Sequence, residues 1–343
     1  MDLAVPQLRL DLPSRLHPHE DRAQQHTQAW VQEMGMIANS PKAREVCDSF
    51  LLGRLAARVY PHASVGRLYV LADWMSAYFI LEDVLDDTVE ARDPEVATEI
   101  ADQFIAPFLG TAPQTGPHRV GDVLAVPRIR EGLADLWART RPGMTAAWTN
   151  RLVHDMTDYL YSHVRQSEIN SSETPFDEDA YCAHRLLTSA MYVSADLIEV
   201  ATARPVPEHL IRNPDVATMR EAASHVVAWV NDLYSAPKEI RLNDLCNYVV
   251  VLTSKLDVSL QEAADLGCPA GRRPGRTVPR RREPRRGRPL PPPAARRPPS
   301  PHQNGRRTQD LDDRQRPLGR GNRPLHRPRD PATGPVQHLA TLI

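Results

Sequence analysis

The sequence predicts an all-α protein, and three observations support this class. Apolar residues recur every three or four positions over long stretches, which is the period of a helix. The clearest stretch contains Val65, Leu68, Tyr69, Ala72, Met75 and Phe79. The alternation of apolar and polar residues that indicates strands is scarce, and the first 266 residues are long enough to bury the core of one large domain.

These periodic stretches predict the helices in chain order. Helices are expected over residues 20–37, 42–59, 65–87, 94–107, 144–172, 178–203 and 217–241. Ser64 is a suitable N-cap for the third of them, and proline and glycine clusters near 109–117 and 203–207 mark breaks. Pro237 removes one backbone hydrogen bond and should bend the last helix. That helix either ends near Ala236 or, as Ile240 and Leu242 favour, continues past the proline.

Four carboxylates crowd the end of the 65–87 helix, namely Glu82, Asp83, Asp86 and Asp87. Like charges repel one another, and the helix dipole disfavours anions at a C-terminus, so a positive group is expected nearby. A solvated acidic turn is the alternative. Because Phe79, Ile80 and Leu81 lead directly into the cluster, we favour metal ions held at the mouth of an apolar pocket.

A second polar motif, NDLYSAPKE, spans residues 231–239. On a helix, Asn231, Ser235 and Glu239 recur at i, i+4 and i+8 and therefore share one face. Amide, hydroxyl and carboxylate oxygens suit a hard divalent cation such as magnesium rather than zinc. The alternative interpretation is a solvated polar stripe.

Together these motifs resemble those of the class I terpene synthases, of the bacterial sesquiterpene cyclase type, over about residues 8–266. Residues 231–239 match the family pattern NDxxSxxxE in full. The segment EDVLD at 82–86 resembles the aspartate-rich motif DDxxD, with Glu82 in place of the first aspartate. The register DVLDD, with Asp83, Asp86 and Asp87 as ligands, is an equally fair interpretation. Arg185 lies 46 residues before Asn231, where the family carries a diphosphate-sensing arginine.

The resemblance implies a single-domain helical bundle that binds three magnesium ions, for which manganese can substitute. Two ions would be held by the carboxylates at 82–87, and the third by Asn231, Ser235 and Glu239. Arg185 and Lys238 would contact the diphosphate as catalytic and substrate-binding residues. The alternative for Arg185 is a surface salt bridge with Glu178 or Asp179.

A carbocation formed in such a site needs aromatic faces around it. The candidates are Trp74, Tyr78, Phe79, Tyr192 and Trp229, for each of which ordinary core packing is the alternative. In the family, the helix carrying the sensor arginine breaks just after it, so that a backbone carbonyl points at the cation. Here that break is expected at Thr188 and Ser189, and Ser189 is also a substrate-binding candidate.

The C-terminal segment, residues 267–343, differs from the body in composition. It has no Phe, Trp, Tyr, Met or Lys, while 19 arginines and 16 of the 32 prolines fall in its 77 residues, giving a net charge of +14 against about −15 for the body. Such a segment cannot form a core. It is a nucleic-acid-binding tail, a disordered extension or the product of a shifted reading frame. We favour the last, because the helical, aliphatic pattern LDVSLQEAADL stops abruptly at Leu266 and gives way to Arg, Pro and Gly, the residues of GC-rich codons. A shifted frame would also explain why the family's final helices and their Arg-Tyr pair are absent.

The function that the sequence predicts is magnesium-dependent ionisation of farnesyl diphosphate and its cyclisation to a sesquiterpene or sesquiterpene alcohol. One alternative is an isoprenyl diphosphate synthase, which would carry a second aspartate-rich motif in place of residues 231–239. Another is an inactive remnant that has lost the last helices. Four scattered cysteines, Cys47, Cys182, Cys246 and Cys268, indicate neither a zinc site nor disulfides. We expect a cytoplasmic monomer or homodimer that binds neither nucleic acid nor membranes, since no signal peptide or membrane-spanning run is present.

Overall fold

The structure is a computed structural model, and it describes residues 3–6, 12–86, 88, 92–112, 119–120, 124–172, 176–242 and 244–267. Asp87 and residues 268–343 lie outside the described residues. The predictions made for Asp87 as a ligand, and for the arginine- and proline-rich segment, therefore stay predictions.

The described residues form helices joined mostly by short connections, together with one pair of very short strands. The helices are α1 Glu20–Glu33, α2 Pro41–Ser49, α3 Leu52–Val59, α4 Val65–Asp86, α5 Pro94–Leu109, α6 Val126–Thr140, α7 Ala146–Ser172, α8 Glu178–Thr188, α9 Met191–Thr202, α10 Glu208–Ile211, α11 Pro214–Leu242, α12 Tyr248–Leu256 and α13 Leu260–Gly267. Strands β1 Arg119–Val120 and β2 Leu124–Ala125 pair antiparallel. The all-α class is confirmed.

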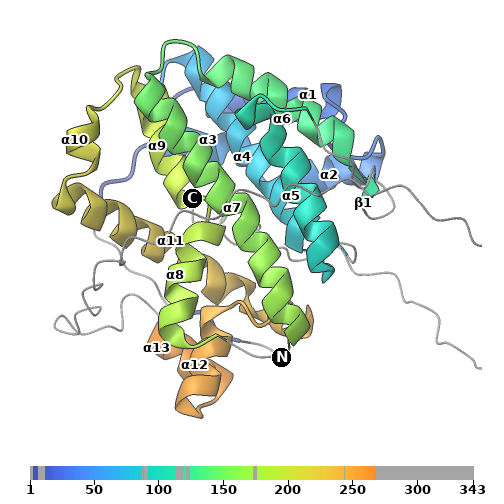
Figure 1. Cartoon of the computed structure of the whole chain (residues 1–343), viewed down its shortest axis with the longest axis vertical. Coiled ribbons are helices and arrows are strands. Elements are labelled where there is room, and N and C mark those ends of the chain that lie inside the picture. The colour runs from blue at the N-terminus through green and yellow to red at the C-terminus, as the bar shows by residue number, and fades with distance from the viewer. Residues whose placement is uncertain are drawn as a thin grey trace, which may run out of the picture. The chain divides into compact units, whose positions relative to one another are not determined.

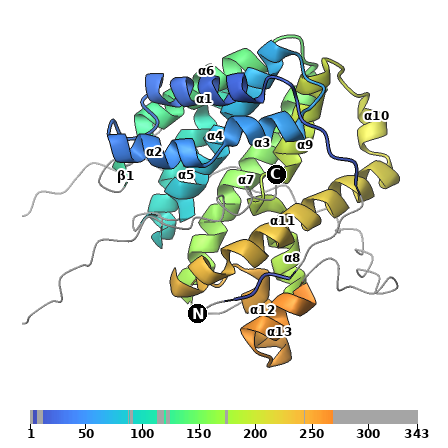
Figure 2. The ribbon, with the colours of Figure 1, turned by 180° about the vertical axis from the view of Figure 1, so that it is seen from behind.

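Helix α4 forms the centre of the main core. Its sequence is apolar on almost every side, and a helix of this kind must be enclosed by other helices. Figure 1 shows α6 and α7 on one side of α4, and the reverse view in Figure 2 shows α1 and α3 covering the other. Helix α9 also packs on α4. The acidic end of α4 therefore emerges from the interior of the bundle.

A second, smaller core holds α8, α11, α12 and α13 together. Tyr248 of α12 stacks on Trp229 of α11, with ring centroids 5.5 Å apart, and on Tyr181 of α8, at 5.8 Å. In Figure 1, α12 and α13 lie at the bottom of the view, below the labels of α8 and α11. The aromatic stack fixes α11, which carries residues 231–239, against α8, which carries Arg185.

Several helix boundaries follow directly from local chemistry. Asp93 caps α5 by accepting a hydrogen bond from the Glu95 amide over 2.9 Å, Pro94 follows in the first turn, and Gly110 ends the helix with φ of 66°. Helix α11 continues through Pro237 to Leu242, as Ile240 and Leu242 favoured.

Several elements differ from the sequence prediction, which did not include the strand pair or helices α10 and α12. The expected helix at 42–59 is two helices, because Leu51 adopts a left-handed conformation with φ of 49°. This conformation is uncommon for a leucine, so the sequence did not predict it. Helix α6 was not predicted, since Pro127 and Gly132 resemble helix breakers. Pro127 instead lies in the first turn, where its missing N–H costs nothing. Gly132 makes room for Met36, whose sulfur would lie 2.3 Å from a Cβ at that position.

None of the helices in the described part of the chain combines the length and the apolar character needed to cross a membrane.

Candidate active site

The predicted acidic ligands lie at the C-terminal end of α4. Glu82 and Asp86 are one helical turn apart and partly buried, whereas Asp83 is exposed. His163 of α7 donates a hydrogen bond from Nδ1 to Oδ1 of Asp86 over 2.7 Å. The sequence did not single out His163, because a lone histidine within a long helix carries no motif.

Charges from three other helices act on Glu82. Burial raises the pKa of the Glu82 carboxyl, and the negative charge of Asp86 raises it further. The positive charges of Arg185, His163 and Lys238 lower it. These bases belong to α8, α7 and α11, so the acidic end of α4 shares one electrostatic environment with the arginine and the lysine that the sequence singled out.

The oxygen column of α11 is already engaged by two hydrogen-bond donors. Arg185 donates to Oδ1 of Asn231 over 2.7 Å. The Asn247 amide donates to Oε2 of Glu239 over 2.6 Å and to Oγ of Ser235 over 3.4 Å. Ser235 is fully buried, so this face of α11 is turned into the protein. The solvated-stripe interpretation is therefore wrong.

Arg185 is buried and paired within the protein. Its Nε donates to Oδ1 of Asp232 over 2.8 Å. Burial alone lowers the pKa of Arg185, but Asp232 and other neighbouring anions raise it overall. The alternative of a surface pair with Glu178 or Asp179 is wrong, since Glu178 instead pairs with Lys255 at 2.5 Å.

The expected break after Arg185 is present. Helix α8 ends at Thr188 and α9 begins at Met191, with Ala190 between them at φ of 54°. The Arg185 guanidinium donates to Oγ1 of Thr188 over 3.1 Å, and Ser189 donates from Oγ to the carbonyl of Leu186 over 3.0 Å. A movement of Arg185 would therefore change its hydrogen bond to Thr188, the last residue before the break.

Several carboxyl groups are buried close together in the interior of the site. Burial raises the pKa of Glu239 to about 8, with contributions from the neighbouring Asp244 and Asp232. Burial also raises the pKa of Asp244, and the charge of Asp86 adds to the effect. The raised pKa values show that ionising these buried carboxyl groups is costly, so a bound cation would stabilise their charged form. Asp244 was not predicted, because it follows α11 and lies outside the helical spacing of the column.

The predicted ligands fit a hard divalent cation in their chemistry. Among the residues that the structure describes, no three His, Cys, Asp or Glu side chains are already gathered as a metal site. The predicted set is different in kind, since it combines carboxylates of α4 with an amide, a hydroxyl and a carboxylate of α11. Oxygen donors of this kind suit magnesium or manganese.

An apolar cavity of about 360 Å³ opens beside the exposed Asp83. Its walls come from α2, α4 and the segments flanking α2, and include Cys47, Phe50, Phe79 and Ile80. The rings of Phe50 and Phe79 stack at 6.2 Å. This volume lies within the range of small-molecule pockets, and Phe79 is the predicted aromatic residue that lines it.

The other predicted aromatic side chains lie in packed surroundings. Trp74 is fully buried, and its indole N–H donates to Oγ1 of Thr140 over 2.9 Å. Trp229 belongs to the second core, against Tyr248. Tyr192 begins α9 just after the break and is partly buried. Their contacts with substrate stay predictions.

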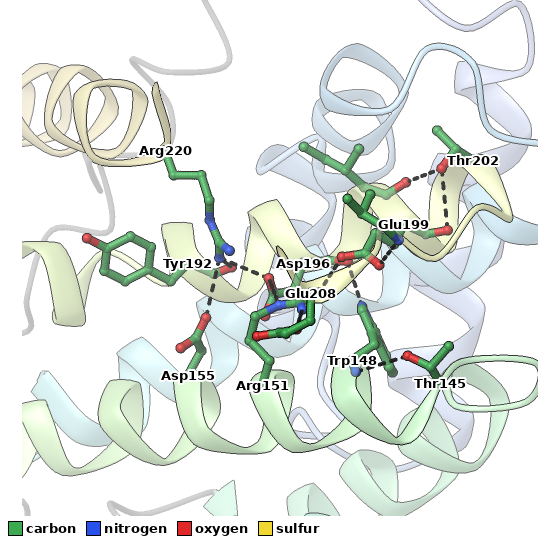
Figure 3. Close-up of polar contacts among 12 residues, drawn as sticks. Thr145, Trp148, Arg151, Asp155, Tyr192, Asp196, Glu199, Thr202, Glu208 and Arg220 are labelled. Carbon is green, nitrogen blue, oxygen red and sulfur yellow. Dashed lines mark hydrogen bonds and ion pairs between the residues drawn. The ribbon is translucent and has the colours of Figure 1, made fainter. Parts of the chain in front are cut away.

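A buried ionic network next to the break was not predicted. Its members are Arg151, Asp155, Asp196, Glu199, Glu208 and Arg220. Figure 3 shows Arg151 of α7 and Arg220 of α11 both reaching Asp196 of α9, each over 2.9 Å. Arg220 also donates to the carbonyl of Tyr192 over 3.2 Å and lies 5.6 Å from its ring. The network thus fixes the start of α9 against α7 and α11.

Known proteins resemble this chain in sequence over the same region. The family described as terpene synthase family 2, C-terminal metal binding, matches residues 73–267. Pristinol synthase of Streptomyces pristinaespiralis is 31% identical over 258 residues, which are 75% of this chain and 68% of the relative. The (+)-T-muurolol synthase of Roseiflexus castenholzii, described as (2E,6E)-farnesyl diphosphate cyclizing, is 31% identical over 73% of each chain.

The fold also resembles a solved structure. Germacradien-4-ol synthase from Streptomyces citricolor superposes with a TM-score of 0.62 at 25% identity, over 76% of this chain and 81% of that one. The helices that carry the site therefore have counterparts in a known helical fold.

Proposed function

The chain belongs to the terpene synthase family, and on this premise we propose that it ionises farnesyl diphosphate with magnesium and cyclises it to a sesquiterpene or sesquiterpene alcohol, releasing diphosphate. The observation that carries the proposal is the convergence on one buried site of the acids of α4, Arg185 of α8 and the oxygen column of α11. Farnesyl diphosphate is favoured because a relative is named for cyclising it.

Three magnesium ions are the proposed cofactor, with manganese as a substitute. Glu82, Asp83 and Asp86, together with Asp87, would hold two of them, and Asn231, Ser235 and Glu239 the third. When bound, the ions act as Lewis acids that neutralise the departing diphosphate. The cluster of buried carboxyl groups described above, whose charged forms a cation would stabilise, supports this assignment.

Arg185 has the chemistry to bind the diphosphate. Its planar guanidinium presents several donors at once, which matches the geometry of phosphate oxygens. At present these donors reach Asn231, Asp232 and Thr188. Exchange of the Asn231 or Thr188 contact for a diphosphate oxygen would couple substrate binding to the α8–α9 break, while Lys238 would add a second positive charge from α11.

The apolar cavity is the proposed site of the prenyl chain. Asp83 is one of its lining residues, and the stacked rings of Phe50 and Phe79 form part of its wall. Apolar walls exclude water, which would otherwise quench the carbocation, and aromatic faces stabilise positive charge by about 0.5–2 kcal/mol each. The cavity therefore serves both shielding and stabilisation.

The test is incubation of the purified chain with farnesyl diphosphate and magnesium, followed by mass spectrometry of volatile products and a measurement of released diphosphate. We expect a cyclic sesquiterpene and its loss in Asn231→Ala. Product formation that survives Asn231→Ala would contradict the metal assignment. Absence of both volatiles and diphosphate release would instead support an inactive remnant. A longer prenyl diphosphate formed on addition of isopentenyl diphosphate would indicate a chain-elongating synthase.

A further inference from the structure

We propose that His163 is a positioning residue for the metal site, which holds one oxygen of Asp86 so that the other oxygen is presented to a divalent cation. The inference rests on the proposed function and names a residue that supports it from α7. Neither the aspartate-rich motif nor the residue 231–239 motif includes this histidine.

The contact has the geometry of an orienting hydrogen bond. Nδ1 of His163 lies 2.7 Å from Oδ1 of Asp86, a short separation that is typical of hydrogen bonds to an ionised acceptor. Within the described part of the chain, no hydrogen bond reaches the second oxygen, Oδ2. The Asp86 side chain is 20% exposed, so it is reachable from the open side of the site. One oxygen is therefore held, and the other is available.

The histidine itself is fixed in place. Its side chain is only 1% exposed, and its ring packs edge-on against Tyr159, one turn earlier on α7, with centroids 4.9 Å apart and planes at 89°. Nε2 has no hydrogen-bond partner among the described residues, so the bond to Asp86 is the polar contact that sets the ring orientation. A rigid donor of this kind reduces the rotamer freedom that Asp86 would otherwise lose on binding a cation.

The contact between His163 and Asp86 also distinguishes Glu82 and Asp86 from Asp83. Glu82 and Asp86 lie at i and i+4, on one face of the helix, and both interact with the charge of His163. Asp83 lies on a neighbouring face and borders the apolar cavity. His163 therefore favours Glu82 and Asp86 as the inward-facing pair.

Three substitutions isolate the Nδ1 contact. His163→Phe keeps the ring volume and removes the donor. In His163→Asn, the amide nitrogen occupies approximately the place of Nδ1, whereas in His163→Gln it occupies approximately the place of Nε2. The readout is binding of Mn²⁺ in the presence of inorganic pyrophosphate, followed by electron paramagnetic resonance without turnover. His154→Asn, on the same helix and 70% exposed, is the surface control.

Outer partners of metal ligands typically contribute 10–100-fold in metal affinity, so we expect His163→Phe and His163→Gln to weaken Mn²⁺ binding by about 10-fold or more, and His163→Asn to stay within roughly 3-fold of the unmodified protein. Thermal melting of each variant monitors folding. Should His163→Phe fail to fold, the comparison between Asn and Gln still decides the matter.

Equal affinity of the Asn and Gln variants would overturn the inference. So would an unchanged affinity in a folded His163→Phe, and in either case the proposed function would stand. If the unmodified protein binds no Mn²⁺ with pyrophosphate, the metal-dependent function is wrong and the inference falls with it.

Discussion

Replacement of Asp155 by asparagine tests the electrostatics of the buried network in Figure 3. Asp155 lies on α7, and Arg220 reaches it over 3.4 Å. Burial and the negative charge of Asp196 raise the pKa of Asp155 from 3.8 to about 7, although Arg220 opposes them. An asparagine side chain at this position would have the same shape and no charge at any pH.

The raised pKa of Asp155 determines whether stability rises or falls with pH. The folded state binds the proton of Asp155 more tightly than the unfolded state, so the stabilisation is fully present below about pH 3.8 and is lost as the pH rises through about 7. Above that pH no further loss occurs. Between about pH 5 and pH 7 the loss amounts to roughly 3 kcal/mol, at about 1.4 kcal/mol for each pH unit.

We therefore expect Asp155→Asn to gain stability relative to the unmodified protein by roughly 3 kcal/mol when the pH is raised from about 5 to 8.5. In a domain of this size, that corresponds to about 6 °C in melting temperature. Urea unfolding at both pH values measures the difference, and any effect of the substitution that does not depend on pH cancels. Glu168→Gln, at an exposed position of the same helix, is the control. A stability difference for Asp155→Asn that stays constant within about 1 kcal/mol across this range would refute the reasoning.

Three further outcomes are expected. Arg151→Met leaves buried carboxylates without their partner and should lower the free energy of unfolding by about 3–5 kcal/mol, measured by urea titration. Arg212, whose side chain is 77% exposed, also pairs with Glu208. As the control, Arg212→Met should lower the free energy of unfolding by less than about 1 kcal/mol in the same titration. Gly53→Ala should lower the melting temperature, because its Cβ would lie 2.3 Å from backbone atoms of Gln24; Gly66→Ala, with open space around it, is the control. Arg185→Lys cannot reproduce the planar fork and should reduce kcat for diphosphate release by about 10–100-fold. The control is Arg165→Lys, at an exposed position of α7, and an unchanged kcat in Arg185→Lys would remove Arg185 from the site.

The sequence anticipated features that depend on local spacing. The three oxygens of residues 231–239 share a face because they recur every four residues, and the structure turns that face inward with Ser235 fully buried. The break after Arg185 falls between Thr188 and Met191, as the family resemblance led us to expect. Pro237 was correctly placed inside a continuing helix.

Other features depend on contacts between distant segments. The helix around Gly132 stays intact because Met36 packs against the space that a side chain would fill, so residue propensity pointed the wrong way there. Asn247 reaches the oxygen column only because α12 folds back on α11 through the Tyr248 stack. No spacing rule predicts such a contact.

The sequence by itself therefore determined the helical class, the two polar motifs and the position of the arginine between them, because helical periodicity and motif spacing are properties of neighbouring residues. Only the tertiary structure decided which side chains support the site: His163 against Asp86, Asn247 against Glu239, and the ionic network beneath the start of α9. These contacts join residues 8 to 77 positions apart. They exist because the packing of the two cores brings separate helices to hydrogen-bond distance, which the order of residues along one helix cannot specify.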